Sequence, residues 1–266
     1  MRFWIGAALA LGALGCKGSG PTPSRPNDAR PGPVRAVPAA EVEPAQEEIQ
    51  VGCCRALVFR PLGALRNERL PLVVALHGLG DRAEGFADLV QALPLRVRVV
   101  VLDGVDPWPG GGGGRQWFPM GSAEAEPAGF VRGVDAVAGA LGALTRRYPT
   151  CGLPVVTGFS QGAMLAYALA GKRQAVVAGV VPIAGRLPAL HVPTPGTSTG
   201  SPVRVRGLHG DADPRISLAD GQAAVEGLRA AGLDARMQVF PGVGHGIPGP
   251  VRAAMVAALS EMARCP

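Results

Sequence analysis

Lysine and aromatic residues are scarce in this sequence of 266 residues. Of the 26 basic residues only Lys17 and Lys172 are lysines, so 26 minus 2 leaves 24 arginines, and aromatic residues make up 5%. The arginines are dispersed, and the adjacent pair Arg146-Arg147 falls at the end of a predicted helix, where cations suit the helix dipole. A net charge of +6 without a basic stripe interleaved with aromatic residues argues against a nucleic-acid partner.

Motifs for a bound metal or cofactor are also missing. The sequence has neither Gly-x-x-x-x-Gly-Lys-Ser/Thr nor His-Glu-x-x-His, and the five-glycine run 110–114 lacks the lysine of a phosphate loop. We therefore expect no metal site and no organic cofactor.

The N-terminus lacks an apolar run long enough to span a bilayer. Residues 3–14 are apolar, but spanning takes roughly 20 residues; the run follows Arg2 and ends in small residues, which predicts a signal peptide over residues 1–16. Its end, Ala13-Leu14-Gly15-Cys16, is similar to a bacterial lipobox. This predicts lipidation of Cys16 and an exported protein, anchored in a membrane through its N-terminal lipid and facing the periplasm or the cell exterior. The alternative is an ordinary secretory signal cut after a small residue.

Four further cysteines, Cys53, Cys54, Cys151 and Cys265, follow the predicted signal. In an exported protein they favour up to two disulfides, and the alternative is four buried thiols. A bridge between adjacent cysteines is strained, so we expect Cys53 or Cys54 to pair with Cys151 or Cys265.

Residues 17–47 are rich in proline, glycine, serine and charge, which predicts a flexible tether before a folded domain over residues 48–266. In that domain, strand-like and helix-like segments alternate, which predicts an α/β fold whose mostly parallel sheet has helices on both faces. The expected strands are 55–59, 71–76, 97–102, 153–158, 175–183, 203–208 and 236–240. The expected helices are 83–92, 123–147, 160–171, 217–231 and 249–263.

Ser160 is the candidate nucleophile. It lies in Gly158-Phe159-Ser160-Gln161-Gly162, between a predicted strand and a predicted helix. Small residues on both sides of the serine permit the sharp turn that exposes its hydroxyl at the sheet edge. The structural alternative is a turn whose serine only caps the helix.

A serine hydroxyl needs a base, and His245 is the best placed of the four histidines because glycines flank it after the last predicted strand. The acid then falls between Ser160 and His245, where Asp211 and Asp213 both follow a strand. The backbone N–H of Gln161 and the glycine-rich loop 76–81 are the expected sources of an oxyanion hole.

Four motifs, LHGLGD (76–81), GFSQG (158–162), HGDAD (209–213) and GHG (244–246), together resemble the phospholipase/carboxylesterase family of α/β-hydrolases, which includes the acyl-protein thioesterases. The resemblance covers residues 70–262 and implies the α/β-hydrolase fold. It also implies Asp213 as the acid and the backbones of Leu79 and Gln161 as oxyanion donors.

Residues 114–118 resemble the loop that precedes a Trp-Phe or Trp-Tyr pair in this family, which implies that Trp117 and Phe118 bind substrate. The chain departs from the family pattern at Pro119, at Ala163 and at residues 216–217. These departures leave the triad intact and the substrate open.

The sequence thus predicts a serine hydrolase that cleaves small-molecule or lipid carboxylic esters through a Ser-Asp-His triad and an acyl-enzyme. Three alternatives remain at this stage: a secreted polyester depolymerase or feruloyl esterase, a serine peptidase on the same fold, and a non-catalytic surface lipoprotein.

Overall fold

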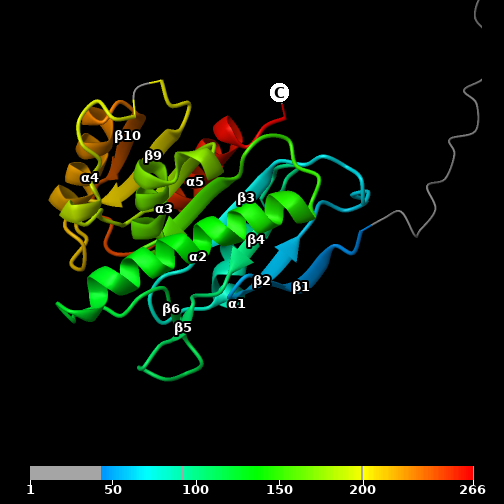
Figure 1. Ribbon diagram of the computed structural model, residues 1–266, viewed down its shortest axis with the longest axis horizontal. Coiled ribbons are helices and arrows are strands. Elements are labelled where there is room, and N and C mark those ends of the chain that lie inside the picture. The colour runs from blue at the N-terminus through cyan, green and yellow to red at the C-terminus, as the bar shows by residue number, and fades with distance from the viewer. Residues whose placement is uncertain (1–42, 92, 199, 266) are drawn as a thin grey trace, which may run out of the picture. The chain divides into compact units, whose positions relative to one another are not determined.

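The computed structural model describes residues 43–265, apart from Ala92 and Thr199 (Figure 1). The predicted signal peptide, Cys16 and nearly all of the predicted tether therefore lie outside the described residues. The described residues form an eight-stranded sheet flanked by helices, together with a small two-stranded sheet.

The large sheet runs in the order β1-β2-β4-β3-β7-β8-β9-β10, and all neighbours from β4 to β10 are parallel, whereas β1 and β2 are antiparallel. Its strands are β1 Gln46–Val51, β2 Cys54–Phe59, β3 Leu72–Leu76, β4 Arg98–Leu102, β7 Val155–Phe159, β8 Gly179–Ile183, β9 Arg204–Gly210 and β10 Asp234–Phe240. In the parallel part, Leu76 pairs with Gly158 and Ile183 pairs with both Phe159 and Leu208. The loops that follow β3, β7 and β9 therefore leave the sheet at one edge.

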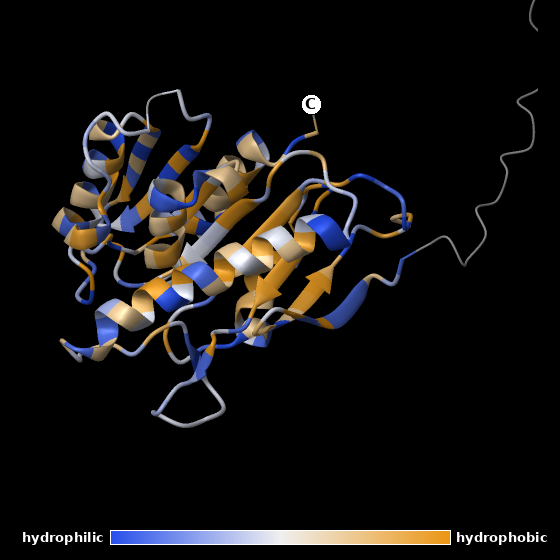
Figure 2. Ribbon diagram, viewed as in Figure 1, coloured by the Kyte–Doolittle hydropathy of each residue, from blue (hydrophilic) through white to orange (hydrophobic). Residues whose placement is uncertain are grey.

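Helices cover both faces of this sheet. They are α1 Ala83–Val90, α2 Ala125–Arg147, α3 Gln161–Lys172, α4 Leu218–Ala230 and α5 Gly249–Met262. Successive residues of β3 belong to two hydrophobic cores on opposite faces of the sheet. Val74 packs in the core formed with α2, α3 and α4, whereas Val73 packs in the core formed with α1 and α5. This agrees with the hydrophobic central strands of Figure 2, since strands covered on both faces need no polar side. Among the described helices, α2 is long and apolar enough to cross a membrane, but most of its large apolar residues lie in the core that contains Val74.

The predicted fold class and all five helices are confirmed, and all seven predicted strands occur, most within two residues of their expected bounds. Three strands were missed, namely β1 and the pair β5 Asp106–Pro107 and β6 Arg115–Gln116. Strand β1 is an edge strand with a mostly hydrophilic sequence (Figure 2), so its apolar pattern is weak.

The predicted start of the folded domain at residue 48 is too late. Strand β1 already begins at Gln46, and the Glu43 carboxylate forms ion pairs with Arg60 at 2.8 Å and with Arg98 at 2.9 Å. Both arginine side chains are buried, so Glu43 neutralises charge that is otherwise costly to bury.

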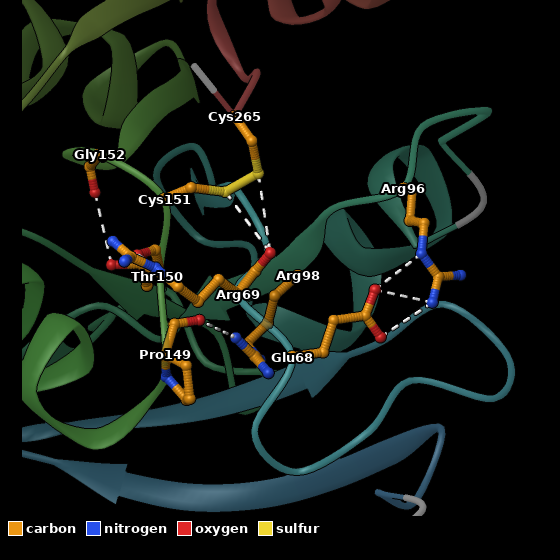
Figure 3. The surroundings of a disulfide bond; sticks show 9 residues. All are labelled: Glu68, Arg69, Arg96, Arg98, Pro149, Thr150, Cys151, Gly152 and Cys265. Carbon is orange, nitrogen blue, oxygen red and sulfur yellow. Dashed lines mark hydrogen bonds and ion pairs between the residues drawn. A yellow bond between two sulfur atoms is a disulfide. The ribbon is translucent and has the colours of Figure 1, made fainter.

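The predicted disulfide pairing is wrong. Cys151 pairs with Cys265, with their Cα atoms 5.1 Å apart, and joins the segment before β7 to the segment after α5 (Figure 3). Cys53 in the turn after β1 and Cys54 at the start of β2 are free thiols, with Sγ atoms 3.9 Å apart. Because Cys54 lies near the carboxyl end of β4 and Cys151 precedes the amino end of β7, the sheet separates them. Burial raises the pKa of the Cys54 thiol to about 12, which makes this thiol unreactive.

We expect Cys265→Ser to lower the free energy of unfolding by about 2–4 kcal/mol, since the bridge spans 114 residues of sequence and restricts the unfolded chain. Urea unfolding monitored by circular dichroism measures the loss. Cys53→Ser, which removes an exposed free thiol, serves as the control and stays within about 0.5 kcal/mol of the parent protein. Equal midpoints for the two variants contradict the expectation.

Candidate active site

Ser160 lies in a sharp turn between β7 and α3. Its backbone adopts φ 53° and ψ −114°, in the left-handed region that non-glycine residues seldom occupy, and its N–H donates to the Ile183 carbonyl at 3.0 Å. The flanking glycines are sterically required. A Cβ at Gly158 would lie 2.4 Å from the Gly162 carbonyl oxygen, and a Cβ at Gly162 would lie 2.3 Å from that of Leu76.

His245 joins Ser160 to Asp213. Its Nε2 lies 2.9 Å from Ser160 Oγ, and its Nδ1 lies 2.7 Å from Asp213 Oδ2. A carboxylate can only accept, so Nδ1 carries the proton and Nε2 is left to accept the serine O–H. The ring of Phe159 packs beside the imidazole, with centroids 4.8 Å apart, and limits its movement.

The Asp213 side chain is fully buried and fully hydrogen-bonded. Its Oδ1 accepts from the N–H groups of Arg215 at 2.8 Å and Ile216 at 3.0 Å, so both oxygens have partners. Burial alone raises the pKa of this carboxyl, but the hydrogen bonds from His245 and from these two N–H groups outweigh it, and the net pKa is lowered. Asp213 is thus ionised at neutral pH.

Asp211, the other candidate acid, is not part of this chain of hydrogen bonds. Its Oδ1 accepts from the Gly242 N–H at 2.7 Å and so holds the loop after β10. His209 is buried nearby and its Nε2 hydrogen-bonds the Ile216 carbonyl at 3.0 Å, so it stabilises the loop that contains Asp213.

The loop after β3 lies opposite Ser160. The side chain of His77 fixes this loop, because its Nε2 accepts from the Gly104 N–H at 2.9 Å while Nδ1 donates to the Gly78 carbonyl at 2.7 Å. Burial lowers the pKa of His77, which favours the neutral ring that this pattern needs. Among the described residues, the N–H groups of Leu79 and Gln161 donate to no protein acceptor and so remain available to a ligand.

Trp117 and Phe118 do not line the cavity, contrary to the prediction. Both side chains are fully buried. Trp117 Nε1 donates to the His77 carbonyl at 2.9 Å. The Gln161 side-chain amide accepts from the Trp117 N–H at 2.9 Å and donates to the Phe118 carbonyl at 2.7 Å. Through these hydrogen bonds, the buried pair connects the loop after β3 to the start of α3.

The sequence reasoning missed these roles of His77 and of the Gln161 side chain. The available signal for His77 was a histidine placed directly after a buried strand and before Gly78. No comparable signal marked the Gln161 amide, whose partners lie about 43 residues away in sequence.

A pocket of about 200 Å³ opens above Ser160. Its wall is mostly apolar, and Leu79, Met120, Phe159, Met164 and Ile216 contribute to it. The described residues contain no group of three His, Cys, Asp or Glu side chains that could hold a metal ion. The site therefore combines a serine hydroxyl, an imidazole hydrogen-bonded to it and two free N–H groups with a mostly apolar wall.

Comparison with known families decides the class of this chain. The model of the phospholipase/carboxylesterase family matches residues 64–261. The chain belongs to this family. Esterase YpfH of Escherichia coli is 29% identical over 185 residues, which cover 66% of this chain and 76% of that one. Acyl-protein thioesterase 1 of Neurospora crassa is 27% identical over 206 residues, 65% of this chain and 79% of that one.

Solved structures of carboxylesterases share the fold of this family member. The carboxylesterase of Mesorhizobium loti superposes with a TM-score of 0.67 at 19% identity, over 82% of this chain and 99% of that one. The Bacillus cereus carboxylesterase superposes with a TM-score of 0.66 at 16% identity, over 78% of this chain and 94% of that one. The chain therefore has the α/β-hydrolase fold.

Proposed function

We propose that this protein is a serine esterase that hydrolyses carboxylic esters through an acyl-enzyme. The observation that carries the proposal is the continuous pair of hydrogen bonds from Ser160 Oγ to His245 and from His245 to Asp213, at 2.9 and 2.7 Å. The family membership, with relatives named as esterases and thioesterases, supports the same reaction class.

In the first half of the reaction, Ser160 Oγ attacks the acyl carbonyl while His245 Nε2 takes its proton. The ionised Asp213 stabilises the resulting imidazolium and holds its orientation. The N–H groups of Leu79 and Gln161 then donate to the oxyanion, and the N-terminus of α3 adds a favourable dipole.

The first half ends when His245 gives the proton to the leaving alcohol, and the acyl-enzyme remains. In the second half, a water molecule that is deprotonated by the same nitrogen attacks the acyl carbon, and the proton then passes to Ser160 Oγ as the carboxylic acid is released. The sharp turn at Ser160, whose N–H donates to the Ile183 carbonyl, keeps the hydroxyl at the sheet edge through both steps. The apolar wall of the pocket suits an ester with a small apolar chain, in line with small-molecule or lipid esters as substrates.

Labelling with a fluorophosphonate probe tests this proposal. We expect phosphonylation of one residue, Ser160, located by mass spectrometry of the digested protein, because only an activated serine reacts readily with the probe. His245→Ala removes the base while leaving the serine in place, so labelling of this variant is slower by orders of magnitude. No labelling of the parent protein, or labelling at another serine, contradicts the proposal.

We also propose that the protein is exported and anchored through a lipid on Cys16. This rests on the sequence of residues 1–16 alone. A peptide that begins at Cys16 and carries a diacylglyceryl group, isolated from membranes, is the observation that decides it.

A further inference from the structure

Arg215 is an exposed residue that adds a positive charge to a mostly apolar pocket, whose wall also includes Asp81. It lines the same cavity as Ser160 and His245. Its backbone position is fixed, because its N–H donates to Asp213 Oδ1 at 2.8 Å. The guanidinium group is therefore attached to the loop that contains the proposed catalytic acid.

No carboxylate of the described residues forms an ion pair with Arg215, unlike Arg186, which pairs with Glu126 at 3.2 Å. The acidic groups near the pocket are engaged elsewhere. Asp213 is paired with His245. The Asp81 carboxylate packs against the first turn of α1, where a Cβ on Gly85 would lie 2.3 Å from its Oδ1. A helix N-terminus of this kind stabilises negative charge, so Asp81 needs no arginine.

An arginine that lines a pocket and forms no ion pair has guanidinium donors free to bind an oxyanion in two parallel hydrogen bonds. We infer that this pocket selects esters that carry a negative charge, such as a free carboxylate, alongside an apolar segment, and that Arg215 binds the charged group. The inference rests on the proposed esterase function and adds the charge of the substrate to it.

Two pairs of esters test the inference, one with the charge on the acyl side and one with it on the alcohol side. The first is mono(4-nitrophenyl) adipate and its methyl ester, and the second is 4-acetoxybenzoate and its methyl ester. For each pair the readout is the ratio of kcat/KM for the charged ester to that for the neutral ester. Comparing this ratio between variants cancels the intrinsic reactivity of the esters.

In Arg215→Gln we expect the ratio to fall about tenfold for at least one pair, which corresponds to about 1.4 kcal/mol. Arg215→Glu lowers it further, and Arg215→Lys retains most of it. Raising the salt concentration lowers the ratio of the parent protein and leaves that of Arg215→Gln unchanged, since salt screens charges at exposed sites.

Arg252→Gln is the matched control, since it removes the same charge from an exposed position on α5 that lies outside the pocket, and it leaves both ratios unchanged. If the parent protein turns over these esters and Arg215→Gln leaves both ratios unchanged, the inference about Arg215 is wrong and the proposed esterase function stands. Absence of ester turnover and of fluorophosphonate labelling in the parent protein overturns the proposed function, and this inference with it.

Discussion

Ser160→Ala lowers kcat for ester hydrolysis by about a million-fold, equivalent to roughly 8 kcal/mol of transition-state stabilisation. The variant keeps the pocket, the N–H donors and His245 but has no atom to form the acyl-enzyme. The expected residual rate comes from binding and oxyanion stabilisation alone. Steady-state kinetics with 4-nitrophenyl acetate measures the loss, with burst titration excluding contaminating parent enzyme.

The fold of Ser160→Ala is expected to remain intact. Alanine keeps the Cβ of serine, and Ala184 already occupies the same positive-φ region in this chain, with φ 51°. The circular dichroism spectrum therefore matches that of the parent protein. Ser201→Ala, a serine outside the pocket, is the control and retains full activity. A Ser160→Ala variant that retains a tenth of the parent kcat disproves the assignment.

The central sheet and Ser160 turn were predictable because they depend on local rules. Strands such as β3 and β4 are buried on both faces and therefore consist almost wholly of apolar residues. The turn at Ser160 has no room for a Cβ on Gly158 or Gly162, so it leaves a pattern that is readable in the sequence. Parallel strands then bring loops that are distant in sequence to one edge, and this placed His245 beside Ser160.

Features that depend on which end of the sheet a segment reaches were not predictable from the residues alone. The sequence does not state that Cys151 and Cys265 lie at one end and Cys54 at the other, so the exclusion of a strained Cys53–Cys54 bridge led to the wrong pairing. Strand β1 was missed because an edge strand carries polar side chains where a central strand cannot.

Trp117 and Phe118 illustrate a further limit. A pair of aromatic residues beside a glycine-rich loop can either line a substrate pocket or lie buried beneath the loop. The same residue types serve both roles, so the sequence does not distinguish them. Only the folded chain shows that both rings are buried and that the Gln161 amide hydrogen-bonds their backbone groups. The residues that line the pocket instead include Met120 and Met164, whose sequence positions carry no motif.

The two neighbouring aspartates are expected to differ sharply when each is changed to asparagine. Asp213→Asn lowers kcat by about four orders of magnitude, by analogy with other triads in which the acid is replaced by its amide. The amide lacks the charge that stabilises the imidazolium, and its NH₂ group can donate to His245 Nδ1, which would move the ring proton to Nε2 and block acceptance from Ser160. The lowered pKa of Asp213 is consistent with this role, because the site stabilises the ionised form that asparagine cannot supply.

Asp211→Asn is the matched control, two residues away on the same loop. Its side-chain oxygen accepts from the Gly242 N–H at 2.7 Å, and the amide oxygen of asparagine still accepts there, so kcat falls by less than about tenfold. Parallel measurements of kcat for the two variants on one neutral ester decide the assignment. If Asp211→Asn lost the larger factor, Asp211 would be the acid that orients His245, and the hydrogen bond from His245 Nδ1 to Asp213 would have no catalytic role.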